Sequence, residues 1–252
     1  MISFNIFTKI IIFPLYYIFH YNIIFGLIHK VFIKKFKYKN LFFQLNDIKI
    51  PLPFYSSFIF NTYELNDRIL LEKNLTRKHR CIIIGGGIGF IPAITNIITR
   101  NKVIIFEINK KILNNLKSNL LRNNIKFQIY NSNLLLNKKD KQNYYFSNEN
   151  FLATSMYRKT SNKIKLKNIY HKKIKNLDNF NTLIIDGEGI ERHYIENINI
   201  LKKIKYIFFE FHNDIFSNNE KNIIFSKLNT KGFILKDSFV NSYYFIKHSA
   251  SR

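Results

Sequence analysis

The sequence predicts an α/β protein with a twisted, mostly parallel sheet and helices on both faces. Two observations carry this prediction. Short apolar runs alternate with longer segments whose apolar residues recur every three or four positions, from about residue 80 onwards. All four residues of the run "CIII" are apolar, so both faces of this segment are apolar, as expected for a parallel strand covered by helices on both sides.

The elements follow from these patterns. We expect strands in seven segments: residues 80–84, 102–107, 125–130, 181–189, 205–212, 233–239 and 242–247, the last two forming a hairpin through residues 240–242. We expect helices in five segments: residues 61–74, 89–100, 109–124, 190–203 and 218–232. Pro92 falls in the first turn of its helix, where proline is tolerated, and Gly232 ends the last helix.

The first 50 residues differ in composition and are expected to form a helical N-terminal segment, with the main domain at 51–252. The run Ile10–Ile28 carries no formal charge and is long enough to span a membrane. However, Pro14 would break its first turn, which favours two short helices instead. Two options stay open for residues 1–40: packing on the next domain, or peripheral contact with a membrane surface through the lysines that follow.

Composition restricts the cellular setting and the partners. The single cysteine, Cys81, excludes a disulfide framework and lies in an apolar run, as a small core residue does. With no small-residue cleavage site after the apolar run, we expect a cytoplasmic protein, with the inner face of the membrane as a second option. The net charge of +24 suggests a polyanion partner, but the basic residues are mostly scattered lysines, so we expect no specific nucleic acid.

Four of the eight glycines lie within "GGGIG", directly after the strand at 80–84 and before a helix. Such a turn brings the backbone close to a ligand and presents the unpaired N–H groups of a helix start. The Gly-Lys-Ser/Thr of a phosphate-binding loop is absent. Gly85, Gly87 and Gly89 are spaced by two, and Phe90 stands where a dinucleotide-binding turn has its third glycine. The spacing therefore favours S-adenosylmethionine over NAD.

Glu107 ends the next strand, about 20 residues after the glycines. Its two carboxylate oxygens can accept hydrogen bonds from two neighbouring ribose hydroxyls. We therefore expect Gly85, Gly87, Gly89 and Glu107 to bind the cofactor. The competing interpretation, a helix cap, fits poorly because Glu107 is the last residue of the expected strand.

Two further strands end in pairs of polar side chains. Asp186 and Glu188 close the strand at 181–189, and Glu210 and His212 close the strand at 205–212. Residues two apart in a strand point to the same face, and ligands of open α/β sheets bind beyond the carboxyl ends of the strands. Ionised acids that end a buried strand are costly without a partner, so the two pairs together favour a functional site.

In this order, the segments "CIIIGGGIGFIP", "VIIFEINKKILNNLKSNLLRNN", "NFLATSMY", "NTLIIDGEGIE", "FFEFH" and "KLNTKGFIL" resemble the FkbM family of S-adenosylmethionine-dependent methyltransferases. The Asp-x-Glu-Gly-x-Glu segment that begins at Asp186 is the most specific part. The resemblance implies the class I methyltransferase fold, which is Rossmann-like with seven strands, one of them antiparallel. It also implies O-methylation, commonly of sugar hydroxyls in metabolites or surface glycans.

Methyl transfer to a hydroxyl needs positioning and a group that accepts the hydroxyl proton. We expect Asp186, Glu188 and His212 to be the catalytic residues, and a small-molecule or glycan acceptor. We expect no metal, although Asp186, Glu188, Glu210 and His212 have the oxygen and nitrogen atoms that one would need. Ile83 departs from the family, which usually has an acid there to organise the pocket around the cofactor's amino group.

Two other functions stay open. The net charge motivates an RNA methyltransferase, although the strand end Asp-Gly-Glu-Gly differs from those of base methyltransferases. Ile83 and the apolar N-terminal segment motivate a membrane-associated protein with a degenerate cofactor site. Cofactor binding separates these hypotheses, because only the degenerate protein would fail to bind S-adenosylmethionine.

Overall fold

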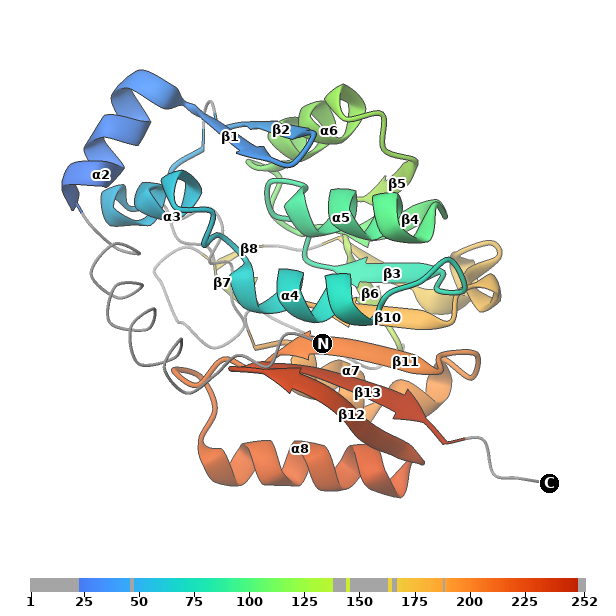
Figure 1. The fold of residues 1–252 in the computed structure, drawn as a ribbon. Helices are drawn as coiled ribbons and strands as arrows, with labels where there is room; N and C mark the ends of the chain where they lie inside the picture. The colour runs from blue at the N-terminus through green and yellow to red at the C-terminus, as the bar shows by residue number, and fades with distance from the viewer. Residues whose placement is uncertain are drawn as a thin grey trace.

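The computed structural model describes residues 23–45, 48–137, 167–187 and 189–248, and the backbone of 144–145 and 163–164. Seven strands form the central sheet in the order β12–β13–β11–β10–β3–β4–β5 (Figure 1). Their bounds are β3 Cys81–Ile84, β4 Val103–Phe106, β5 Phe127–Tyr130, β10 Thr182–Ile185, β11 Tyr206–Glu210, β12 Phe233–Phe239 and β13 Ser242–Lys247.

The pairing directions confirm the predicted fold class. Strands β5, β4, β3, β10 and β11 are parallel to one another, and β13 runs antiparallel between β11 and β12. This is the seven-stranded, Rossmann-like arrangement with one antiparallel strand that is expected of the class I methyltransferase fold. The predicted hairpin is present, with its turn at Val240 and Asn241.

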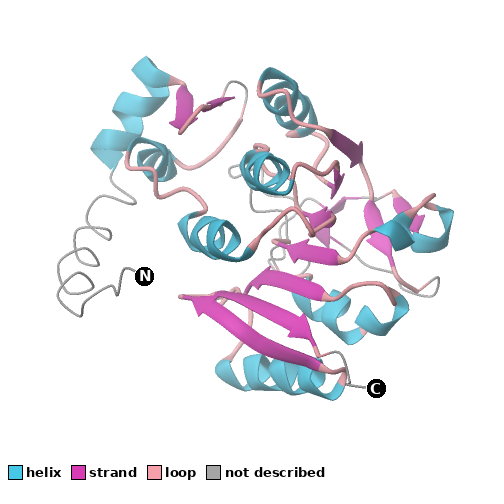
Figure 2. Cartoon of the chain, turned by 45° about the vertical axis from the view of Figure 1, so that its right-hand side comes forward, coloured by secondary structure: helices cyan, strands magenta, loops and turns pink. Residues whose placement is uncertain are grey.

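Helices cover both faces of the sheet (Figure 2). Cys81 and Ile83 of β3 join the core under α4 (Leu65–Asn74), α5 (Phe90–Thr99) and α6 (Leu113–Arg122), whereas Ile82 and Ile84 join the core under α7 (Glu191–Glu196) and α8 (Asn218–Thr230). Side chains of a strand alternate between faces, so an all-apolar strand serves two cores at once. Cys81 is fully buried, as its sequence context predicts.

Smaller elements complete the described chain. Strands β6 (Asn133–Leu135) and β9 (Asn168–Tyr170) pair in parallel, and the two-residue strands β7 (Tyr144–Tyr145) and β8 (Lys163–Ile164) pair antiparallel. Three short 3-10 helices lie in the second half of the chain: η3 His171–Lys173, η4 Leu177–Asn179 and η5 Ile198–Ile200.

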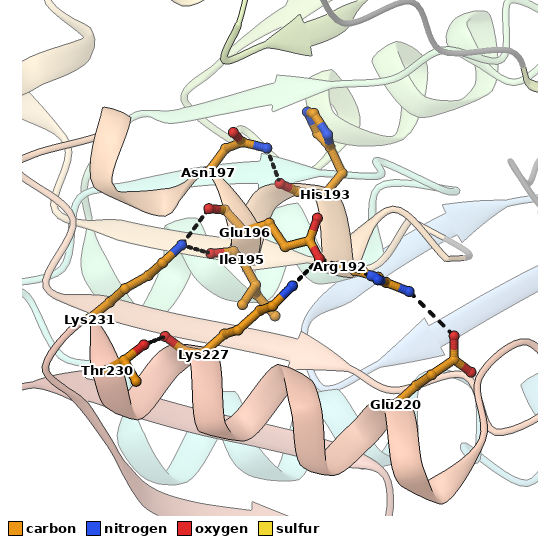
Figure 3. Close-up of polar contacts among 9 residues, drawn as sticks. All are labelled: Arg192, His193, Ile195, Glu196, Asn197, Glu220, Lys227, Thr230 and Lys231. Carbon is orange, nitrogen blue, oxygen red and sulfur yellow. Dashed lines mark hydrogen bonds and ion pairs between the residues drawn. The ribbon is translucent and has the colours of Figure 1, made fainter.

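Polar contacts fasten α7 to α8 (Figure 3). Arg192 pairs with Glu196 at 3.0 Å and with Glu220 at 3.4 Å, and Lys227 of α8 also pairs with Glu196. The Lys231 ammonium donates to the backbone carbonyl of Glu196. A six-residue helix is not stable by itself, so these contacts help to hold α7, which begins at Glu191.

The N-terminal part contains helices and a hairpin. α2 (Ile23–Ile28) continues into a π-helical turn, η1 (His29–Ile33), and η2 (Leu52–Tyr55) leads into α3 (Ser56–Ile59). Between them, β1 (Lys35–Tyr38) and β2 (Leu41–Gln44) form an antiparallel hairpin that was not among the predicted elements. The break expected at Pro14 between two short helices lies outside the described residues, and α2 covers the end of that run. Over the ranges that the structure describes, every helix is too short or too polar to cross a membrane.

The hairpin was hard to predict because its strands are short and lysine-rich, and their stability comes from distant residues. Phe36 and Phe43 are buried in the core that also contains Ile83 and Phe90. Phe36 lies 5.1 Å from the Phe90 ring, and Phe43 lies 5.5 Å from it, both edge-on. Hydrophobic contacts with the start of α5 therefore hold the hairpin over the glycine turn.

Asn119 of α6 connects the hairpin to this turn. Its fully buried side chain accepts a hydrogen bond from the Gln44 backbone N–H at 2.8 Å and donates one to the Ile88 carbonyl at 2.9 Å. Ile88 is part of the "GGGIG" turn. One amide side chain therefore satisfies backbone groups from two segments that lie 44 residues apart.

Replacing Asn119 by alanine leaves a backbone donor and a backbone acceptor without partners, so Asn119→Ala should lower the free energy of unfolding by about 2–3 kcal/mol in urea titrations. Asn123→Ala is the matched control, since Asn123 bonds the exposed Phe42 backbone of the same hairpin. We expect the control to cost less than about 1 kcal/mol. Equal losses in the two variants would show that Asn119 has no special role.

Candidate active site

Three neighbouring strands end at the same level and bring the predicted site residues together. Gly85 follows β3, Glu107 follows β4 and Asp186 follows β10. The Asp186 N–H donates to the Ile84 carbonyl at 3.0 Å, and the Gly85 N–H donates to the Phe106 carbonyl at 3.0 Å. The parallel register therefore continues one residue beyond each strand, and the first polar groups after each strand lie at one edge of the sheet.

Each glycine of the turn is required for a different physical reason. Gly85 has φ +92°, and a Cβ there would lie 1.9 Å from the Asp186 carbonyl oxygen. Its missing side chain thus serves the close approach of two strand ends. Gly87 has φ +49° and borders a hollow, with the Tyr63 hydroxyl 3.3 Å from where its Cβ would be. Gly89 is the N-cap of α5 and its bare side faces α6.

Glu107 points at the glycine turn. Its Oε2 accepts hydrogen bonds from the N–H groups of Gly86 at 2.9 Å and Gly87 at 3.2 Å, and its Oε1 accepts one from Asn109 at 2.7 Å. The side chain is buried, and burial raises the pKa of its carboxyl, while these three donors oppose the rise. A carboxylate has about four acceptor positions, so most of its capacity is already used.

A cluster of acidic residues surrounds the end of β10. Carboxylate oxygens of Glu64, Asp67, Asp186 and Glu210 all lie within 4.8 Å of one another. Glu64 and Asp67 come from the start of α4, whereas Asp186 and Glu210 follow or end neighbouring strands. Four of the sixteen acidic residues thus meet at one point of a protein with net charge +24, which makes this point locally attractive to cations.

His212 joins the cluster from the segment after β11. Its Nε2 lies 3.9 Å from the Asp186 Oδ1 and 3.8 Å from the Glu210 Oε2. Its Nδ1 lies 3.1 Å from the Oε1 of Glu191, which is fully buried. A carboxylate can only accept, so the Nδ1 proton donates to Glu191 and Nε2 faces the two acids. Glu191 therefore sets the tautomer and orientation of the imidazole.

Burial and neighbouring charges shift the pKa values of two acids in the cluster. Burial raises the pKa of Asp186 well above its ordinary value, and the nearby carboxylates of Glu64, Glu210 and Asp67 add to the rise. Burial also raises the pKa of Asp67 to about 6, against the lowering effect of Ser242 and His212. Acids with raised pKa values can hold or release a proton near neutral pH, which is the range that general acid–base chemistry needs.

The cluster has the donors for either a divalent cation or an organic cation. Asp186, Glu210 and His212 each offer one ligand atom within 4.8 Å of the others. Mixed carboxylate and imidazole sets bind several divalent metals, so the donor set alone does not select an ion. The adjoining hollow is small and is lined by Tyr63, Glu64, Gly85, Gly86, Gly87, Phe90, Ile91 and Asp186.

This hollow has the chemistry that S-adenosylmethionine requires. It combines bare glycine backbone, two aromatic side chains and two carboxylates. The cofactor carries a positive sulfonium and a positive ammonium, which the carboxylates of Glu64 and Asp186 would attract. Sites that enclose a whole ligand usually have volumes of about 300–1,000 Å³. This hollow has room for little more than a water molecule, so most of the cofactor would lie outside it.

The structure brings together some of the predicted site residues but not all of them. It brings Asp186 and His212 together, it places Gly85 and Gly87 at the hollow, and Glu188 lies outside the described residues. Sequence reasoning assigned no function to Glu64 or Asp67. They precede the first sheet strand and belong to an ordinary amphipathic pattern, so no local signal marked them.

No family model matches the chain, and no curated protein sequence matches it. Solved structures with a similar fold include a methyltransferase from Pyrococcus furiosus, at 14% identity and TM-score 0.45, covering 88% of this chain and 93% of that one. Another is the ribosomal protein L11 methylase from Lactobacillus delbrueckii subsp. bulgaricus, at 12% identity and TM-score 0.46, with 72% and 77% covered.

A third is precorrin-6y C5,15-methyltransferase from Geobacter metallireducens, at 13% identity and TM-score 0.42, with 74% and 86% covered. The three structures are similar to this chain in fold.

The raised pKa of Asp67 makes a prediction about stability. The unfolded chain loses this proton near pH 4 and the folded chain near pH 6, so the contribution of Asp67 to stability falls as pH rises from about 4 to 6. Asparagine cannot ionise. Asp67→Asn should therefore be more stable than the wild type at pH 7, by on the order of 2 kcal/mol, with little difference below pH 4.

Urea unfolding at several pH values measures this difference. Asp178→Asn, at an exposed acid of η4, is the control and should change stability by less than about 0.5 kcal/mol at any pH. A wild type as stable as Asp67→Asn at pH 7 would contradict the raised pKa.

Proposed function

We propose that this protein is an S-adenosylmethionine-dependent O-methyltransferase of the FkbM family, acting on a sugar hydroxyl of a glycan or related metabolite. One observation carries the proposal. The glycine turn, Glu107 and the cluster of Asp186, Glu210 and His212 meet at the carboxyl edge of the sheet. This is the place where open α/β sheets bind their ligands. The sugar acceptor is inferred from the resemblance in sequence.

The proposed cofactor-binding residues are Gly85 and Gly87, which line the hollow, and the buried Glu107, which is hydrogen-bonded to the turn, while Gly89 shapes the turn. Glu107 is oriented toward the turn, which supports a role beside the ribose. Accepting two ribose hydroxyls would require the carboxylate to release at least one of its three backbone donors. We expect the cofactor hydroxyls to replace the bond from Gly87, the longest of the three at 3.2 Å.

Glu64 is the proposed partner of the cofactor's ammonium group. Ile83, which stands where the family usually has an acid, is fully buried in the core and cannot face the hollow. Glu64 lines the hollow and is the N-cap residue of α4. It has φ +50°, a left-handed conformation that is uncommon for residues other than glycine and often marks a functional position.

S-adenosylmethionine supplies an activated methyl group and leaves as a neutral thioether. The described residues would handle the proton of the acceptor hydroxyl. The His212 Nε2 is the proposed proton acceptor, because Glu191 holds the ring from behind and stabilises the imidazolium that forms. Asp186 is proposed to hydrogen-bond the same hydroxyl, and Glu188 stays a proposed catalytic residue on the sequence argument alone.

The acidic cluster argues against RNA as the acceptor. RNA-binding sites need basic side chains around the cofactor, whereas the described residues around this hollow include Glu64 and Asp186, with Asp67 and Glu210 behind them. A degenerate cofactor site is better supported than an RNA methyltransferase. The carboxylate of Glu107 already accepts hydrogen bonds from the backbone, and the hollow is small.

Calorimetry with S-adenosylmethionine tests the proposal directly. The wild type should bind the cofactor, and Glu107→Gln, which loses one acceptor oxygen, should bind about 10- to 100-fold more weakly. Thermal unfolding without ligand checks that the variant is folded. A wild type that does not bind at millimolar cofactor would leave only the degenerate site. If it binds, release of S-adenosylhomocysteine with sugars or with RNA then decides between the two acceptor classes.

The role of Glu64 has a more selective test. S-adenosylhomocysteine keeps the ammonium group of the cofactor but has a neutral thioether in place of the sulfonium, and methylthioadenosine has the same thioether and no ammonium group. Glu64→Gln should weaken binding of S-adenosylhomocysteine about tenfold or more and leave binding of methylthioadenosine unchanged. Glu72→Gln, at the far end of α4, is the matched control and should change neither affinity. Equal losses for both ligands would place Glu64 elsewhere than beside the ammonium.

A further inference from the structure

The N-terminal helical segment exposes an apolar surface made of residues outside the proposed site. Its large side chains include Phe32, which is 80% exposed, Ile24 at 69% and Ile23 at 62%. We call the full set the N-terminal apolar face: Ile23, Ile24, Leu27, Ile28, Val31, Phe32 and Ile33, all exposed. Single exposed apolar residues are ordinary, but seven within eleven positions mark an interaction surface.

The segment is anchored to the protein through its other side. A Cβ at Gly26 would lie 1.9 Å from the Leu52 carbonyl oxygen, so α2 contacts η2 closely there. Phe25 meets the Phe60 ring edge-on at 5.1 Å, and the His29 Nε2 bonds the Lys35 carbonyl at 2.8 Å. The exposed side chains therefore belong to an ordered segment with a fixed inner side, and they point away from it.

Its position is peripheral. α2 lies at the outer edge of the molecule beside the β1–β2 hairpin, away from the central sheet, in both views (Figure 1, Figure 2). The glycine turn and the acidic cluster are on other elements.

Positive charge accompanies the apolar face. Lys30, Lys34 and Lys35 are exposed within and directly after it. No acidic residue occurs anywhere from Ile23 to Gln44. An apolar strip edged by lysines, without acids to repel head groups, matches the chemistry of an anionic lipid surface, which offers apolar chains beneath a layer of negative charge.

We propose that the N-terminal apolar face docks the protein peripherally on anionic membranes. The Ile, Leu, Val and Phe side chains enter the boundary between head groups and acyl chains, and the lysines contact the lipid phosphates. Over the residues that the structure describes, α2 is too short to span a bilayer, so the proposed contact is a peripheral one. The proposal does not depend on the proposed methyl transfer.

Vesicle co-sedimentation of the full chain tests this, with vesicles of phosphatidylcholine alone or mixed with phosphatidylglycerol. The wild type should bind the mixed vesicles, with weaker binding to phosphatidylcholine alone and at high salt. The double substitution Ile24→Ser with Phe32→Ser should bind at least tenfold more weakly. Ile97→Ser with Leu121→Ser, at two other exposed apolar residues of 51% and 58% exposure, should bind like the wild type.

Several results would overturn the proposal. One is a wild type that does not sediment with either vesicle, and another is equal loss of binding in both double variants. Light scattering in solution covers the other occupants of the face. A wild-type dimer that Ile24→Ser with Phe32→Ser converts to a monomer, together with no vesicle binding, would assign the face to a second copy of the chain.

Discussion

The parallel register between β3 and β10 is the constraint on which the site depends. Ile84 pairs with Ile185, and the following Asp186 N–H continues the ladder to the Ile84 carbonyl. This leaves no room for a side chain at Gly85, because the Asp186 carbonyl occupies that space. A shift of one residue would bury Asp186 in the sheet and remove it from Glu210 and His212.

The acidic cluster costs free energy of folding when no cation or proton offsets its charge, which indicates a functional role. Burial raises the pKa values of Asp67 and Asp186, and at Asp186 the neighbouring carboxylates of the cluster add to the rise. Such arrangements persist where a cation or a proton is handled. The chain as a whole has a net charge of +24, so this acidic cluster differs in charge from most of the protein and attracts cations locally.

Contacts between segments far apart in the sequence stabilise the glycine turn. Asn119 satisfies backbone groups of Gln44 and Ile88, and Phe90 packs against two phenylalanines of the hairpin. On the opposite face of the sheet, the ion pairs between α7 and α8 hold the helix that presents Glu191 to His212. Both faces of the sheet thus help to hold the proposed site, one through the turn and the other through the imidazole.

The sequence by itself determined the seven strands of the central sheet and the helices that cover it, because the apolar run "CIII" and the spacing of apolar residues in the helices are local properties. It also located Glu107, Asp186 and His212, since each follows or ends an apolar strand. Only the tertiary structure decided that Glu64 and Asp67 join them, that Glu191 orients His212, and that the lysine-rich segment from Lys35 to Gln44 is a hairpin. These features depend on contacts between residues far apart in the chain, about which neighbouring residues carry no information.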